Sequence, residues 1–254
     1  MSEKRVYDLP TRVFHWVFAG CFLTAFAIAN TLDDESTGFS YHMIAGMVMV
    51  SAVVWRILWG VFGSTHARFS DFSLRPAALV DYLRNALTGT TPLWSGHNPA
   101  SSWAALIMML LALGLGTTGY LMVSTPWGES LEDVHEILAN SFIVVVVLHL
   151  AGIILHTLKH KDALGKSMIH GRKRHLPDSV LPVHSHTAVG LVVLMLSVGV
   201  GAYLLGNYNP DSRTLTVAGT TLQLHEFEDE NHEYSKGYKD DDDDEEREDH
   251  PHRD

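Results

Sequence analysis

The chain has 254 residues, of which 46% are hydrophobic, and it carries a formal net charge of −11. Its apolar residues are gathered into runs that are too long and too poor in charge for the core of a soluble domain, which excludes a soluble globular protein. The net negative charge comes from residues 207–254, which hold sixteen Asp and Glu against five Lys and Arg, whereas the rest of the chain has thirteen of each sign and is neutral. We therefore expect a membrane protein that contacts lipid and has no nucleic-acid partner.

Five apolar runs are each long enough to cross about 30 Å of hydrocarbon as a helix, in which a single segment satisfies its own backbone. In chain order they are residues 13–30, 43–62, 103–123, 136–155 and 181–205. The polar connection between the second and third runs has apolar residues at helical spacing over 75–87, which predicts a short interfacial helix. The sequence thus predicts an all-α membrane protein with five transmembrane helices.

Basic residues occur on one side of this topology. Lys and Arg are found before the first run, in the 61–102 connection and after the fourth run, whereas the 31–41 and 124–134 connections contain neither. Cytoplasmic loops carry an excess of Lys and Arg. We therefore expect the N-terminus to be cytoplasmic and, after five spans, the C-terminus to lie outside.

Four histidines lie within or beside these runs, at His15, His42, His135 and His149. In a helix, the fourteen residues from His135 to His149 correspond to roughly 21 Å along the axis and about 40° around it. These two rings therefore face the same way at two depths. Because an ionisable side chain is costly inside a bilayer, such a column of histidines indicates a buried metal or haem iron.

The topology pairs the histidines by depth, His42 with His135 near the outer face and His15 with His149 near the inner face. Two imidazoles from different helices fill both axial positions of a haem iron, and such a haem carries electrons and does not readily activate oxygen. The haem would be bound non-covalently, because the lone Cys21 leaves no Cys-x-x-Cys-His motif. The alternative for any single histidine is a hydrogen bond that bridges two helices.

Small and basic residues near the histidines fit a porphyrin between helices. Gly46 and Ala139 each lie four residues after a histidine of the outer pair, on the same helix face. Arg12 and Arg56 lie near the inner face, where they can pair with haem propionates. The glycines of 114–119 match the spacing of a dinucleotide-binding loop, but inside an apolar run they favour close helix packing or the approach of a flat ligand.

Six short stretches of the chain occur in an order and spacing typical of one family. They are VYDLPTRVFHW from Val6, WRILWG from Trp55, ARF from Ala67, GHNP from Gly96, VHE from Val134 and LH from Leu148. With these stretches the chain resembles, over about residues 5–175, the family of bacterial cytochrome b561 and the cytochrome b subunit of nickel-iron hydrogenase. The resemblance implies a helical bundle with two b-type haems whose ligands are His15, His42, His135 and His149. It also implies electron transfer between a membrane quinone and a partner such as hydrogenase or a c-type cytochrome.

We expect three parts in the chain. Residues 1–175 would form a di-haem, four-helix membrane domain, residues 176–206 a fifth transmembrane helix, and residues 207–254 an external, acidic and His-rich tail that is partly disordered. The tail would dock a basic soluble cytochrome, bind a divalent metal weakly, or be merely solvated.

The expected function is that of a di-haem b-type cytochrome of the bacterial inner membrane, which transfers electrons between the quinone pool and a periplasmic c-type cytochrome or hydrogenase. No residue is assigned a catalytic role, and the chain would be an electron-transfer subunit or a quinone oxidoreductase. One alternative is a superoxide-to-quinone oxidoreductase of the same fold, which requires an electropositive outer entrance. Another is a haem-free metal-ion transporter or sensor, which requires carboxylates beside the membrane histidines, where Glu136 is the candidate.

Overall fold

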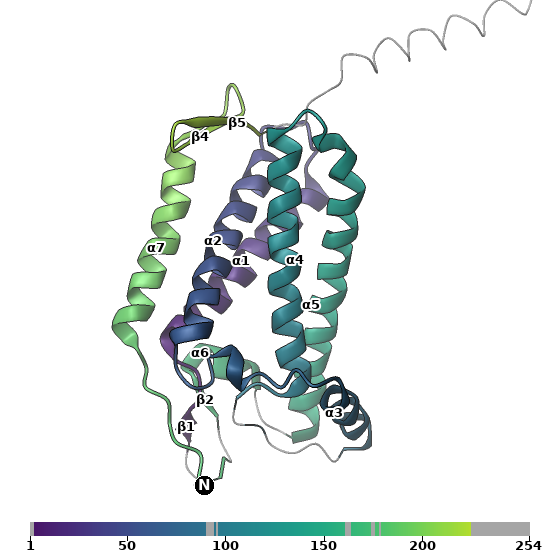
Figure 1. Ribbon diagram of the computed structural model, residues 1–254, viewed down its shortest axis with the longest axis vertical. Coiled ribbons are helices and arrows are strands. Elements are labelled where there is room, and N and C mark those ends of the chain that lie inside the picture. The colour runs from purple at the N-terminus through teal and green to yellow at the C-terminus, as the bar shows by residue number, and fades with distance from the viewer. Residues whose placement is uncertain are drawn as a thin grey trace, which may run out of the picture.

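The computed structural model describes residues 3–89, 94, 96–160, 164–173, 176–177 and 179–224. Five long helices run side by side along the long axis of the molecule (Figure 1). They are α1 (Leu9–Thr31), α2 (Ser40–Phe62), α4 (Pro99–Ser124), α5 (Glu132–His160) and α7 (Thr187–Gly206). All five are long and apolar enough to cross a membrane. We call the end that holds the N-terminus in Figure 1 the lower end, and the opposite end the upper end.

Polar caps determine where two of the spanning helices begin. The side chain of Asp8 accepts a hydrogen bond from the backbone N of Thr11 at 2.9 Å, and that of Asn98 accepts one from the backbone N of Ser101 at 2.8 Å. A proline follows each cap in the first turn, where its missing N–H would have no helical partner anyway. Both helices therefore begin four residues before the apolar runs from which they were predicted.

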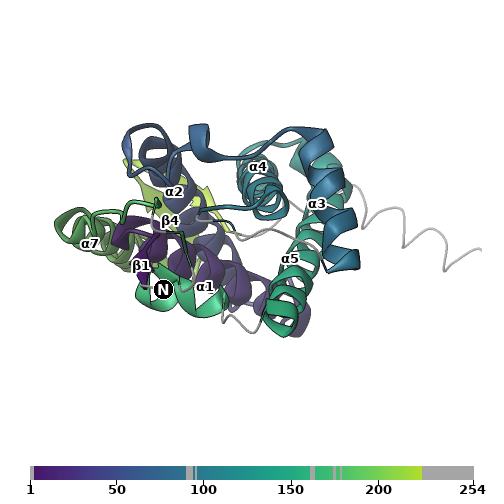
Figure 2. The ribbon, with the colours of Figure 1, turned by 90° about the horizontal axis from the view of Figure 1, so that it is seen from below.

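The helices pack in a connected series. α1 contacts α2, α2 contacts α4 and α4 contacts α5, while α7 lies along α1 and α2. Seen from below, α7 stands at one edge of the bundle and α5 at the other (Figure 2). A Cβ atom on Gly116 would lie only 2.2 Å from Cγ2 of Val50, so this glycine lets α2 and α4 approach closely. The buried residues at the centre of the bundle are Phe18, Met49, Val53, Met109, Ala112 and Phe142.

The fifth spanning helix begins later than its apolar run. α7 starts at Thr187, because the residues before it are extended and bonded to the N-terminal segment. The backbone N of Val183 donates to the carbonyl of Arg5 at 2.9 Å. Apolar residues before Thr187 thus belong to a connection and not to the membrane span.

Short elements close the lower end of the bundle. The helix expected over 75–87 is present as α3 (Pro76–Thr88), and α6 (Ser167–His170) follows α5. β1 (Lys4–Arg5) pairs antiparallel with β2 (Arg172–Lys173), which ties the start of the chain to the segment after the fourth spanning helix. The described residues form further 3₁₀ turns at this end, Phe69–Asp71 and Leu164–Lys166, and another at the upper end between α4 and α5, Gly128–Leu131.

A small antiparallel sheet covers part of the upper end. Its order is β3 (Tyr208–Asn209), β4 (Thr214–Val217) and β5 (Thr220–Gln223). The buried residues that join the sheet to α2 and α7 are Ile44, Leu204, Leu215, Leu222 and Leu224. The first part of the expected tail is therefore folded against the bundle, while its acidic, His-rich part from residue 225 onward lies outside the described residues.

Candidate functional site

The upper end of the bundle brings two of the four membrane histidines together. His42 lies in the first turn of α2 and His135 in the first turn of α5, and both are half-buried. Their ring centroids are 6.3 Å apart and their planes are inclined by 62°. Two residues that are 93 positions apart in the chain thus form one site.

Hydrogen bonds fix which ring nitrogen of each histidine remains available. Nδ1 of His42 lies 2.9 Å from the carbonyl oxygen of Ala25, which can only accept, so this nitrogen carries the proton. Nδ1 of His135 lies 2.8 Å from Oγ1 of Thr118, whose own proton is donated to the carbonyl of Gly114 at 3.0 Å. The hydroxyl therefore accepts from His135. Both rings keep Nε2 unprotonated, which is the state of an imidazole that binds a metal.

The spacing of the upper rings fits two ligands on one metal. With a metal–nitrogen bond of about 2.0 Å and a ring centre about 1 Å beyond the nitrogen, two imidazoles on opposite sides of one ion have centres roughly 6 Å apart. The observed 6.3 Å agrees with this value. A Cβ atom on Gly46 would meet no atom within 4 Å, which leaves open space one turn below His42. Ala139, one turn below His135, is half-buried and small. The residues present thus fit a flat group between α2 and α5.

The lower pair, His15 on α1 and His149 on α5, is also half-buried. The two imidazoles are near enough to interact electrostatically. The ring of Trp16 packs edge-on to that of His15, with centroids 5.2 Å apart. α1 and α5 thus supply one histidine each, as α2 and α5 do at the upper end.

A layer of phenylalanine side chains separates the two histidine pairs. Phe142 lies seven residues from both His135 and His149 on α5 and is 1% exposed. Its ring stacks on Phe22 of α1 with centroids 4.7 Å apart and lies 5.8 Å from the ring of Phe18. The two candidate sites therefore lie above and below an apolar layer.

The two arginines expected near propionates differ in their surroundings. Arg56 is 3% exposed, donates from Nη2 to the carbonyl of Ala67 at 2.8 Å and lies over the ring of Phe69 at 5.0 Å. Its Nη1 is buried and has no hydrogen-bond partner among the described residues. Arg12 instead turns toward α6, where its Nη1 donates to the carbonyl of Ile169.

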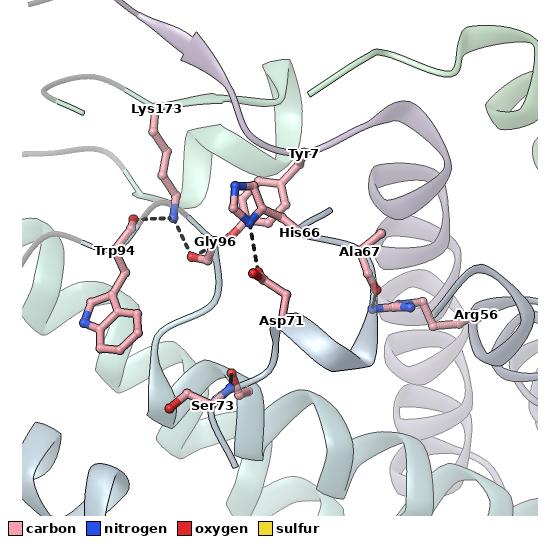
Figure 3. A network of polar contacts seen from close by, with 10 residues as sticks. Tyr7, Arg56, His66, Ala67, Asp71, Ser73, Trp94, Gly96 and Lys173 are labelled. Carbon is pink, nitrogen blue, oxygen red and sulfur yellow. Dashed lines mark hydrogen bonds and ion pairs between the residues drawn. The ribbon is translucent and has the colours of Figure 1, made fainter. Parts of the chain in front are cut away.

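Polar residues from four segments meet below α2 (Figure 3). Nδ1 of His66 lies 2.8 Å from Oδ2 of Asp71. Lys173 is 7% exposed, and its Nζ donates to the carbonyl of Gly96 at 3.0 Å. The ring of His97 packs against Phe72 with centroids 4.8 Å apart. We call these five residues, Arg56, His66, Asp71, His97 and Lys173, the lower polar cluster.

Lys173 did not stand out in the sequence as a site residue, and His97 did so only as part of the GHNP stretch. His97 belongs to the GHNP stretch just before α4, and a histidine at a helix start inside a recurring motif is a signal that could have indicated it. Lys173 resembles any other basic residue of a cytoplasmic connection. Its burial depends on the pairing of β1 with β2, which no local pattern reveals.

Comparison with protein families identifies the chain. A family model described as prokaryotic cytochrome b561 matches residues 6–171, which is well over half of the chain and includes all four membrane histidines. No curated protein and no solved structure gave a significant match. Family membership implies b-type haem and electron transport in a membrane. The chain belongs to the prokaryotic cytochrome b561 family.

Proposed function

We propose that the chain binds two b-type haems and transfers electrons between the quinone pool and a redox partner at the upper end. The observation that carries this proposal is the upper pair, in which His42 and His135 lie 6.3 Å apart, each donating Nδ1–H to a protein oxygen. When bound, each haem supplies a reversible one-electron couple.

The protein's own residues hold and shield the two sites. His42 with His135, and His15 with His149, would supply the axial nitrogens from different helices. Filling both axial positions leaves none open for oxygen, which suits electron transfer. The Phe18, Phe22 and Phe142 side chains pack against one another between the two sites.

The upper surface supports a basic partner. Exposed carboxylates lie beside both upper histidines, in the connections before α2 and α5 and at the start of α5; they are Asp33, Asp34, Glu35, Glu129, Glu132, Asp133 and Glu136. The described residues of these connections and of the sheet include a single basic side chain of the Lys or Arg type, that of Arg213. Opposite charge speeds encounter between proteins, as between this surface and a basic c-type cytochrome. The same charge gives no electropositive entrance for superoxide.

The haem-free alternative lacks the side chains it needs. Within the described residues, no group of three or more His, Cys, Asp or Glu side chains converges as ligands for a metal ion. Two histidines per site suit a haem iron, which already has four porphyrin nitrogens, better than a bare metal ion that needs four or more protein ligands.

The test is to count haems in purified chains. We expect two b-type haems per wild-type chain and about one in His42→Ala, because removing an axial ligand empties the upper site. His184→Ala, which changes an exposed histidine at the lower end, serves as the matched control and should retain both haems. A chain purified in detergent from haem-replete cells without any reduced-minus-oxidised haem spectrum would refute the proposal.

A further inference from the structure

The lower polar cluster buries two cations that contact no carboxylate among the described residues; the buried carboxylate of Asp8 attracts Arg56 only from beyond contact distance. Arg56 and Lys173 are 3% and 7% exposed. Ion pairs among the described residues join His66 to Asp71 and Arg172 to Glu3, so neither buried cation has a carboxylate partner within 4.0 Å. Carbonyl oxygens satisfy the hydrogen bonds of Lys173 but supply no full negative charge. A buried cation is costly unless it is paired, so this arrangement favours an anion from outside the chain.

Buried donors at the same end of the bundle lack acceptors. Nη1 of Arg56, Nε1 of Trp55 and Nε1 of Trp103 are buried and have no hydrogen-bond partner among the described residues. Indole and guanidinium groups can only donate. Nδ1 of His97 is also buried without a partner. Since buried polar groups are nearly always hydrogen-bonded, these groups indicate a ligand that is rich in acceptor oxygens.

The cluster lies beside the lower histidine pair. His97 interacts electrostatically with Arg56 and Lys173 of the cluster and also with His149 of the lower pair. Burial first, and then these neighbouring cations, lower the pKa of His97 to about 3. Arg56 of the cluster also lies 5.9 Å from the ring centroid of Phe14, the residue before His15. The lower polar cluster is therefore a group of buried cations and hydrogen-bond donors next to a candidate haem ligand.

We propose that the lower polar cluster binds the propionate carboxylates of the lower haem, with Arg56 as their buried ion-pair partner, His97 beside it and Lys173 as a second positive charge. This inference rests on the proposed function and specifies which residues hold one of its cofactors. A b-type haem carries two carboxylates, which supply the ion-pair contacts that Arg56 and Lys173 lack and acceptors for the unpartnered donors.

A quinone head group fits the cluster less well. Its two carbonyl oxygens would accept hydrogen bonds, but a neutral ring would leave Arg56 and Lys173 without a carboxylate in contact. Arg12, the other arginine expected near the propionates, lies outside the cluster and is bonded to the carbonyls of Asp8 and Ile169.

The test is a redox titration of both haems in the full-length chain with Arg56→Gln or Lys173→Gln. Reduction adds one negative charge to a haem, so loss of a nearby cation favours the oxidised form. At a fixed potential, we expect the reduced-to-oxidised ratio of the lower haem to fall about tenfold, which is about 59 mV for one electron. The upper haem should be unchanged. Arg84→Gln and Lys166→Gln, which remove exposed cations, are the matched controls.

Several outcomes decide the proposal. Selective loss of the lower haem in Arg56→Gln, with the upper haem retained, would support it as strongly as the shifted potential. If both variants keep two haems at unchanged potentials, the cluster does not bind propionates. An unchanged potential with a raised KM for quinol would show that the pocket binds quinone, and would also overturn the inference. In these last two cases the haem count still upholds the proposed function.

Discussion

Thr118 decides which nitrogen of His135 points toward the space between the upper rings. Its hydroxyl accepts from Nδ1 of His135 at 2.8 Å because its own proton is bonded to a backbone carbonyl one turn earlier. Such outer-shell hydrogen bonds orient metal-binding imidazoles and raise their basicity. The residue thus links the backbone of α4 to His135 on α5.

Replacing Thr118 by valine should weaken the upper haem site. Valine keeps the shape of threonine but removes the acceptor for His135, so we expect haem affinity at this site to fall about 10- to 100-fold. The measurement is haem transfer from the purified chain to an excess of a haem-scavenging protein. Thr117→Val is the matched control, since the Thr117 hydroxyl bonds only within its own helix and the residue is exposed. Equal retention in the two variants would contradict the role of Thr118.

Gly46 should be required as a small residue beside the upper haem. Nothing lies within 4 Å of a Cβ built at this position, so a larger side chain has room in the structure and would occupy the space of the haem. We expect Gly46→Leu to fold and to contain only the lower haem, measured as the haem-to-protein ratio. Gly199→Leu, at an exposed position of α7 that is equally open, should keep both haems. Two haems in Gly46→Leu would place the upper haem elsewhere.

At the scale of helices, the packing of α2 against α4 depends on Gly116. A Cβ there would lie 2.2 Å from Cγ2 of Val50, a distance that real Cβ atoms do not show. We expect Gly116→Ala to lower the free energy of unfolding by about 1–3 kcal/mol, as overpacking of a core does. Val50→Ala in the same chain should restore most of the loss. Thermal unfolding in detergent measures both, and Gly199→Ala should show no loss.

Hydropathy was sufficient to find the five spanning helices but not to find where each begins. Length and lack of charge predict a span because lipid offers no hydrogen bonds to the backbone. The starts depend on other interactions: Asp8 and Asn98 extend two helices upstream, and pairing of Val183 with Arg5 shortens another. The histidine pairing could be anticipated from depth, since α2 and α5 both begin at the upper end. The lower polar cluster could not, because four separate segments build it.

At the scale of the whole molecule, charge is distributed unevenly between the two ends. The lower end carries the basic residues of the N-terminal segment, the α2–α4 connection and β2, whereas exposed carboxylates dominate the described connections of the upper end. Positively charged loops stay in the cytoplasm during insertion. The upper histidine pair would then face the periplasm, where soluble redox partners diffuse.

Labelling of single cysteines should reveal this orientation. In a Cys21→Ser background, Glu129→Cys places a thiol at the exposed upper end and Arg84→Cys places one at the exposed lower end. We expect a membrane-impermeant maleimide to label intact spheroplasts at position 129 at once and at position 84 only after permeabilisation, because the basic lower end is retained inside. A reversed pattern would place the upper haem site on the cytoplasmic side, and the partner of its acidic surface would then have to be a cytoplasmic protein.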